Sequence, residues 1–206
     1  VFIPNGITAP DARPAKRIKE RWGLDKDSYL LYLSRIVPGK GLEYLLEAYK
    51  DISSPLRLVV AGGSSHTDGY LEELKMLAKE DERILFTGFV DGEVLEELFS
   101  NNKIFVFPSD SEGMPIALLE AMSYGNCCLV SDIPENLGVT GDKAAVFMKS
   151  DVTDLKSHLE DLLADERLVN SFRASAAKHV LQRFNWEDIV QRILALYSTS
   201  KGERDC

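Results

Sequence analysis

Residues 104–122 are IFVFPSDSEGMPIALLEAM, and they contain a unit that recurs along the chain. The apolar run Ile104–Phe107 is short and continuous, which is typical of a strand covered on both faces. A polar loop with one glycine follows, and Ile116–Tyr124 then has helical periodicity. Pro115 suits an early position of that helix. The stretch therefore predicts a strand, a loop and a helix.

The same alternation extends along the chain in both directions. The other strands expected are Leu30–Leu33, Leu56–Ala61, Ile84–Phe86, Cys127–Val130 and Ala144–Phe147. The other helices expected are Leu42–Tyr49, Tyr70–Lys79, Val94–Ser100, Asp151–Ala164, Arg167–Gln182 and Trp186–Ser198. Alternating strands and helices predict an α/β fold, a Rossmann-like doubly wound parallel sheet of about six strands with C-terminal helices.

Composition excludes several other classes of protein. The chain has 206 residues and a net charge of −9, which argues against non-specific binding to nucleic acid. No apolar run approaches the roughly 20 residues that a membrane-spanning helix needs. Cys127 and Cys128 are expected to be buried thiols, and the three cysteines form no disulfide framework. His66, His158 and His179 lack the spacing of metal ligands, so no metal site is expected.

Ligands of such sheets bind beyond the carboxyl ends of the strands, and the first polar loop there is residues 34–41, SRIVPGKG. Gly39 and Gly41 allow the backbone to approach a ligand closely. Arg35 and Lys40 suit the binding of a diphosphate, although a surface loop with two solvated charges is the alternative. Because a tyrosine occupies the third glycine position of G-x-G-x-x-G, a dinucleotide site is weakly supported.

The second polar loop lies inside the opening stretch. The backbone N–H groups of Gly113 and Met114 are expected at the start of the following helix, where they face any bound anion. Glu112 precedes this helix. Smaller signals come from the glycines of residues 62–63 and from residues 88–91, each of which is also consistent with an ordinary turn. Together the four strand ends favour a cleft on one rim of the sheet.

Glu120 lies inside the same helix, on the stripe that carries Ile116 and Leu119. A carboxylate among apolar neighbours is costly unless it accepts hydrogen bonds. The hydroxyls of a ribose are suitable donors, because an ionised carboxylate can only accept. A helix cap or a buried ion pair is the alternative.

The spacing of Glu112 and Glu120 within PSDSEGMPIALLEAM resembles the E-x7-E signature of the glycosyltransferase group 1 proteins, family 4. Residues 34–41 are similar to the diphosphate loop of that family. Residues 3–7, IPNGI, are similar to the linker into its C-terminal domain, and residues 184–186, FNW, are similar to the turn before its last helix. The resemblance covers nearly all of the chain, with the motifs in the family's order.

The resemblance implies one half of a GT-B enzyme, in which two Rossmann-like domains face a cleft and the C-terminal one binds a nucleotide-sugar. It implies transfer with retention of anomeric configuration, without an essential metal and without a cofactor. Arg35 and Lys40 would hold the diphosphate, and Glu112 would contact hydroxyls of the donor sugar; these three are the catalytic candidates. The donor-binding candidates are Gly39, Gly62, Phe89, Val90, Gly113, Met114, Pro115 and Glu120. Among them, Glu120 would hold the ribose, Phe89 and Val90 would lie near the base, and residues 113–115 would line the sugar–phosphate path.

The resemblance also implies a division of the chain. Residues 1–7 are expected to be the remnant of an interdomain linker, and residues 8–185 the nucleotide-sugar-binding domain. Residues 186–198 would form a helix that crosses to a missing N-terminal domain, and residues 199–206 a disordered tail. Because Val1 begins in the middle of this pattern, we expect a fragment that is inactive by itself.

The partners implied are a UDP- or GDP-sugar as donor and a saccharide or lipid-linked acceptor held by the missing domain, with polysaccharide biosynthesis as the setting. No nucleic acid is expected. The resemblance places the full-length enzyme in the cytoplasm and allows its peripheral association with the inner face of the membrane. The base and the sugar stay open. A non-catalytic nucleotide-binding module and a Rossmann enzyme that uses a dinucleotide are the competing hypotheses.

Overall fold

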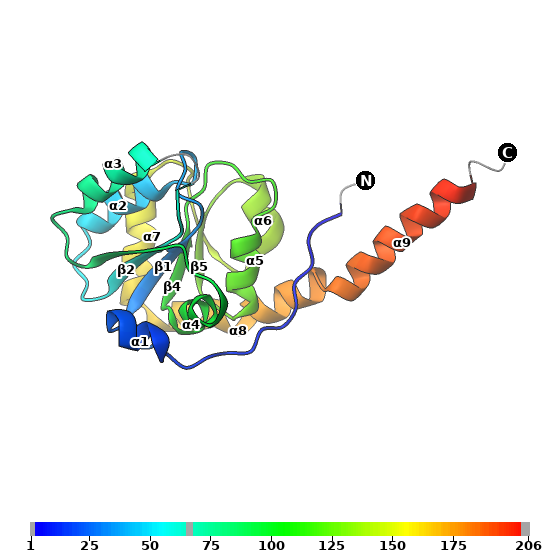
Figure 1. Ribbon diagram of the computed structural model, residues 1–206, viewed down its shortest axis with the longest axis horizontal. Helices are drawn as coiled ribbons and strands as arrows, with labels where there is room; N and C mark the ends of the chain where they lie inside the picture. The colour runs from blue at the N-terminus through cyan, green and yellow to red at the C-terminus, as the bar shows by residue number, and fades with distance from the viewer. Residues whose placement is uncertain (1–2, 65–67, 203–206) are drawn as a thin grey trace.

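The computed structural model describes residues 3–64 and 68–202 and has a six-stranded, all-parallel sheet at its centre (Figure 1). The strands are β1 (Tyr29–Leu33), β2 (Arg57–Ala61), β3 (Ile84–Gly88), β4 (Ile104–Phe107), β5 (Cys128–Ser131) and β6 (Ala145–Phe147). Their order across the sheet is β3-β2-β1-β4-β5-β6, which is a doubly wound, Rossmann-like topology. The predicted fold class is confirmed, and each predicted strand lies within two residues of its observed bounds.

Helices cover both faces of this sheet (Figure 1). One face is covered by α2 (Leu42–Lys50), α3 (Asp68–Ala78) and α7 (Val152–Ala164). The other face is covered by α1 (Arg17–Trp22), α4 (Gly92–Asn101), α5 (Ile116–Ser123), α6 (Pro134–Thr140) and most of α8 (Glu166–Arg183). The last helix, α9 (Trp186–Gly202), extends away from the body of the domain (Figure 1).

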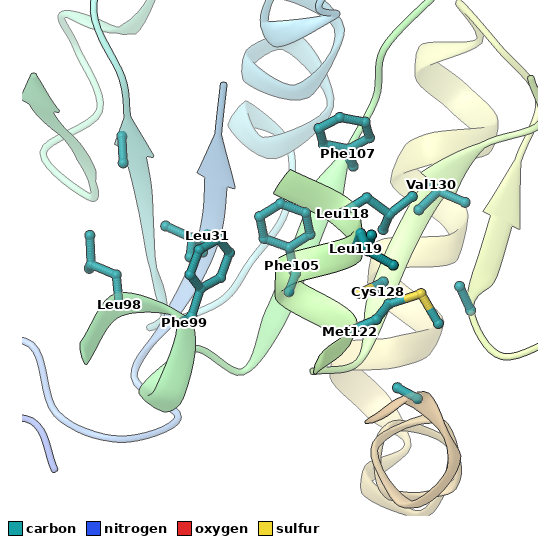
Figure 2. Close-up of a cluster of buried hydrophobic side chains, with 14 of the residues drawn as sticks. Leu31, Leu98, Phe99, Phe105, Phe107, Leu118, Leu119, Met122, Cys128 and Val130 are labelled. Carbon is teal, nitrogen blue, oxygen red and sulfur yellow. The ribbon is translucent and has the colours of Figure 1, made fainter. Parts of the chain in front are cut away.

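The core has two layers because successive side chains of a strand point to opposite faces. In β1, Leu31 packs into the layer beneath α4 and α5, whereas Leu30 and Tyr32 pack beneath α2. Figure 2 shows the first layer, in which Phe105 from β4 meets Phe99 from α4. Burying side chains of this size stabilises the fold by about 1.5–3 kcal/mol each. The continuous apolar strands of the sequence follow from this two-sided burial.

The sequence analysis did not predict α1 or α6. Both helices are held by contacts with residues of other elements, which a local sequence pattern does not reveal. The carboxylate of Glu97 in α4 is almost fully buried, and it accepts hydrogen bonds from Lys16 N at 2.9 Å and Ile18 N at 3.1 Å. It thereby caps the start of α1. At the other end of the sheet, buried Asn136 in α6 donates from Nδ2 to Ser131 O at 3.2 Å, which ties α6 to β5.

The segment expected to be a linker runs beside the junction of α8 and α9 (Figure 1). Ile7 N donates to Phe184 O at 2.7 Å, and Gly6 lies flat against the indole ring of Trp186. A Cβ at residue 6 would lie 2.5 Å from Trp186 Cδ2, so this contact requires glycine. The motifs at the two ends of the chain therefore pack against each other.

Helix α9 carries exposed apolar side chains along its length, including Val190, Leu194 and Tyr197. It continues to Gly202, which corrects its expected end at Ser198 and shows helix where residues 199–202 were expected to be disordered. Residues 1–2 of the expected linker and residues 203–206 of the expected tail lie outside the described residues. Within residues 3–64 and 68–202, no helix has both the length and the apolar content that a membrane span requires.

Candidate functional site

A cavity of about 810 Å³ lies where the strand order reverses, between the carboxyl ends of β1 and β4 and their neighbours. We call it the switch-point cavity. The predicted site residues that line it are Arg35, Lys40, Gly62, Phe89, Val90, Glu112 and Glu120. These residues follow four different strands, so the expected cleft on one rim of the sheet is confirmed.

A second cavity of about 540 Å³, which we call the side cavity, adjoins the loop that carries Glu112. Gly113, Met114 and Pro115 line this side cavity rather than the switch-point cavity. The loop is thus a wall between two hollows, with Glu112 facing one and the next three residues facing the other. Gly39 lines neither cavity.

Lys40 and Glu112 form a buried ion pair in the switch-point cavity. Lys40 Nζ lies 2.7 Å from Glu112 Oε1, and the two side chains are only 14% and 8% exposed. This contact excludes the alternative of a loop with two solvated charges. Glu112 Oε1 nevertheless lacks a well-aligned hydrogen bond among the described residues. The oxygen that faces Lys40 can therefore still accept a hydrogen bond from a ligand hydroxyl.

Arg35 stands apart from this pair. Its side chain lines the same cavity and is exposed, and it makes no ion pair or hydrogen bond within the part of the chain that the structure describes. A guanidinium in such a position can bind an anion without first breaking an internal contact. Lys40 and Arg35 thus provide two cations, one already neutralised by Glu112 and one not.

Glu120 reaches the cavity from α5 and is partly buried. Burial raises the pKa of its carboxyl above the ordinary value. Among the described residues its carboxylate has neither an ion pair nor a hydrogen bond, so the alternative of an internal ion pair or cap is not found there. The expected apolar stripe was partly wrong, because Ile116 is 48% exposed and lines the cavity beside Glu120, whereas Leu119 is fully buried in the core.

Two helices begin at this edge of the sheet. Gly41 directly precedes α2, and Pro115 directly precedes α5, which begins at Ile116 as expected. The backbone N–H groups of Gly113 and Met114 donate no hydrogen bond to any described residue. Free N–H groups and positive helix ends at the carboxyl edge of the sheet favour the binding of an anion.

The glycines of this edge serve the packing of strand ends more than the approach of a ligand. Gly41 has φ +69°, and a Cβ there would lie 2.0 Å from Pro108 O. Gly62 has φ +135°, and its Cβ would lie 1.9 Å from Ser34 O. Only glycine fits at either position, since neighbouring backbone occupies the space. Gly39 has open space around it, and the close approach of a ligand to Gly39 and Gly41 stays a prediction.

The sequence analysis missed a cluster centred on Asp110. Its Oδ2 accepts from Tyr44 Oη at 2.9 Å, its Oδ1 accepts from Ser150 Oγ at 2.8 Å, and its N–H donates to Gly39 O at 2.9 Å. These bonds join the loop of Lys40 to the loop of Glu112. Asp110 lies in the loop just after the end of β4, and this was the signal that could have identified it.

No metal-binding cluster is apparent in residues 3–64 and 68–202, where no three His, Cys, Asp or Glu side chains come together. His66 lies outside the described residues. The expectation that no metal or cofactor is needed stays a prediction. Cys127 and Cys128 are buried as expected, and burial raises the pKa of the Cys127 thiol to about 12.

Comparison with known proteins identifies one family, and the names of the similar proteins agree with it. Residues 14–179 match the family described as glycosyl transferases group 1. The chain is 31% identical over 182 residues to the serotype-specific mannosyltransferase WbdA of Escherichia coli, covering 85% of this chain and 22% of WbdA. It is 27% identical over 222 residues to the GDP-mannose-dependent alpha-(1-6)-phosphatidylinositol monomannoside mannosyltransferase of Mycolicibacterium smegmatis, covering 98% and 57%.

Solved structures show the same fold. HepE of Anabaena, crystallised in complex with UDP and glucose, superposes with a TM-score of 0.82 at 18% identity, covering 89% of this chain and 51% of HepE. The chain spans from about a fifth to little more than half of the length of these three proteins. It has the architecture of one half of a GT-B fold.

Proposed function

The chain belongs to the glycosyl transferases group 1 family, and from this premise we propose that it is the donor-binding half of a retaining glycosyltransferase. The enzyme would transfer a sugar from a nucleoside diphosphate sugar to a glycan or lipid-linked saccharide. The observation that carries the proposal is the buried Lys40–Glu112 pair on the wall of the switch-point cavity, with Arg35 and Glu120 lining the same space. Cations for a diphosphate and carboxylates for sugar hydroxyls thus lie in one cavity.

The proposed chemistry follows the charge that develops in the reaction. As the glycosidic bond breaks, negative charge grows on the leaving nucleoside diphosphate, and fixed cations stabilise it there. Arg35 and Lys40 supply the positive charge, and the positive end of the α5 dipole adds to it. We propose that these groups suffice without a divalent metal.

Glu112 is proposed to contact the hydroxyls of the donor sugar. Its Oε1 is buried and lacks a well-aligned hydrogen bond, which supports a hydroxyl donor from the substrate. The sugar centre becomes oxocarbenium-like during transfer, so a nearby carboxylate also stabilises it electrostatically. Lys40 then lies between the leaving diphosphate and Glu112 and is attracted to both.

The nucleoside is proposed to lie toward α5 and the end of β3. Glu120 would accept hydrogen bonds from the ribose, because its carboxylate has no partner among the described residues. Phe89, which is 78% exposed, and Val90 would lie near the base. Residues 113–115 would line the path of the sugar and phosphates from the far side of the loop.

The acceptor is proposed to bind through a part of the enzyme beyond these residues, and this chain by itself is proposed to transfer little or no sugar. The names of WbdA and of the M. smegmatis enzyme support a role in the synthesis of saccharides or glycolipids. A cytoplasmic location, with peripheral association of the full-length enzyme at the membrane, belongs to the same proposal.

Calorimetric titration with UDP, GDP and ADP, each with and without magnesium, tests the proposal. We expect one nucleotide to bind without magnesium, and Arg35→Ala or Lys40→Ala to weaken it. The matched control is Lys156→Ala, which removes a positive charge from α7 away from both cavities. Equal losses in all three variants, or no binding of any nucleotide by the full-length parent, would contradict the donor site.

A non-catalytic nucleotide-binding module is the competing function, and the titration alone does not separate it from an enzyme. Transfer by the full-length parent does. Glucose- or mannose-nucleotides labelled in the sugar are incubated with a mixture of saccharide acceptors, and nucleotide release is followed with and without acceptor. Release that depends on the acceptor supports the enzyme, and tight nucleotide binding without any release supports the module.

A further inference from the structure

The side cavity differs from the switch-point cavity in its charges. It is formed by the loop 113–115, the start of the chain, α6 and the junction of α8 with α9. Its charged lining residues are Arg183, Arg192 and Glu135. Two cations and one carboxylate surround a hollow of about 540 Å³ in a chain whose net charge is −9. The proposed donor site does not use these charged side chains.

Arg183 is held in place at the edge of this cavity. Its Nη1 lies 3.0 Å from His179 Nε2 on the preceding turn of α8, and its guanidinium carbon lies 5.3 Å from the centroid of the Phe184 ring. Within the described residues it forms no ion pair with a carboxylate. A planar guanidinium that is stacked and unpaired is preorganised to bind an oxyanion with two N–H groups.

Arg183 and Val139 compete for the same nitrogen of His179. The same Nε2 atom of His179 also lies 3.0 Å from Val139 O. If Nε2 carries a proton, it donates to Val139 O and has no lone pair for Arg183; if it does not, it accepts from Arg183 and faces the carbonyl oxygen with a lone pair. In either state, only one of the two contacts of Nε2 is a hydrogen bond. An anion that bound Arg183 would remove the conflict, because Nε2 could then donate to Val139 O alone.

From this geometry we infer that the side cavity, which Arg192 also lines, binds an oxyanion group of the acceptor, a phosphate or a carboxylate, through Arg183. The wall between the two cavities is the loop 112–115, and the proposed path of the donor sugar runs along it. A charged acceptor group in the side cavity would therefore lie on the opposite side of this loop from the leaving diphosphate. That the anion belongs to an acceptor rests on the proposed function, whereas the binding of an oxyanion at Arg183 does not.

Titration of the isotopically labelled chain with glycerol 3-phosphate and, separately, with glucuronate tests the site by NMR. We expect saturable shifts at Gly138, at Val139 and at the Arg183 side chain. Tighter binding of glycerol 3-phosphate assigns a phosphate-bearing acceptor, and tighter binding of glucuronate assigns a uronate. Arg183→Gln should weaken the better ligand at least fivefold, and Arg183→Lys should weaken it less, because the charge remains. Arg167→Gln removes the same charge from the opposite end of α8 and should leave the affinity unchanged.

The double variant Arg35→Ala/Lys40→Ala separates this site from the donor site. Shifts at Gly138 and Arg183 should persist in it with the same dissociation constant. If nucleotides do not bind but these shifts are observed, the proposed function is wrong and the oxyanion site is supported. Three results would each overturn the inference. They are shifts confined to residues 34–41, equal affinity of the Arg183→Gln and Arg167→Gln variants, and the absence of shifts at a ligand concentration of about 50 mM.

Discussion

Glu97 of α4 and Glu120 of α5 have the same carboxyl group, but they differ in whether the protein supplies its hydrogen-bond partners. Glu97 is 4% exposed, and its carboxylate accepts from two backbone N–H groups, those of Lys16 and Ile18. Glu120 is less deeply buried, yet it has no partner among the described residues, and burial raises the pKa of its carboxyl. The protein itself satisfies the first carboxylate and leaves the second open toward a cavity.

The difference separates a structural carboxylate from a binding one by a physical criterion. A buried carboxylate costs free energy unless hydrogen bonds compensate it. Where the chain supplies those bonds, the carboxylate stabilises the fold; where it does not, the fold bears a cost that a ligand can relieve. Glu112 is intermediate, because Lys40 pairs with it while one of its oxygens lacks an aligned hydrogen bond.

The largest expected effect comes from removing the structural carboxylate. Glu97→Ala removes the acceptor of the buried Ile18 N–H and of the partly buried Lys16 N–H, and we expect it to lower the free energy of unfolding by about 3 kcal/mol. Urea denaturation followed by circular dichroism measures this. Glu96→Ala is the matched control, since Glu96 is a partly exposed neighbour that pairs with Arg13, and it should cost about 1 kcal/mol or less. A loss for Glu97→Ala no larger than for Glu96→Ala would remove the distinction between the two kinds of carboxylate.

A smaller effect is expected when the cation of the buried pair is removed. Lys40→Ala should weaken the binding of nucleoside diphosphates by about 2 kcal/mol, or about 30-fold, because a charge-assisted contact to phosphate is lost. The affinity for nucleosides should change little, since Lys40 lies at the phosphates in the proposed arrangement. Calorimetry with a nucleotide and its nucleoside measures both. Equal losses for the two ligands would place Lys40 outside the diphosphate site.

The sequence allowed the sheet and the rim to be predicted, because both follow from short-range patterns. Strands such as Ile104–Phe107 are apolar throughout, and the polar loops come directly after them. The six residues of α1 have no such pattern of their own, and the helix depends on the carboxylate of Glu97. Similarly, the contact of Lys40 with Glu112 depends on β1 and β4 being neighbours in the sheet, which local sequence does not encode.

The two glutamates also show why the site was only partly predictable. Glu120 could be recognised because it is a single charge in the apolar helix 116–123. Glu97 follows another glutamate, and which of the two is buried depends on how α4 packs against α1. Sequence could identify an unusual carboxylate, but it could not show whether its partner is a backbone N–H group or a ligand.

The third prediction concerns the open carboxylate. Glu120→Gln should weaken nucleoside binding about tenfold, which is about 1.4 kcal/mol, because an amide replaces an ionised acceptor of ribose hydroxyls. The same change should leave the midpoint of thermal unfolding unchanged or higher, since it removes a charge that burial disfavours. Nucleoside titration and differential scanning calorimetry on one preparation measure both. Weaker binding accompanied by a lower melting temperature would instead indicate a structural role like that of Glu97.

The smallest expected effect is a dependence on pH that only the open carboxylate should produce. Because the pKa of Glu120 is raised in the folded chain, its carboxyl takes up a proton at a higher pH than it does in the unfolded chain. This contribution makes the fold more stable as the pH falls through the raised pKa, whereas ribose binding needs the ionised form and weakens over the same range.

Acidification should therefore lower nucleoside affinity before it affects the phosphate contacts, and a nucleoside is the ligand to use because it has no titrating phosphate. NMR titration at a series of pH values, with the Glu120→Gln variant as reference, measures the effect. An identical pH profile in the two proteins would mean that Glu120 does not contact the ribose in its ionised form.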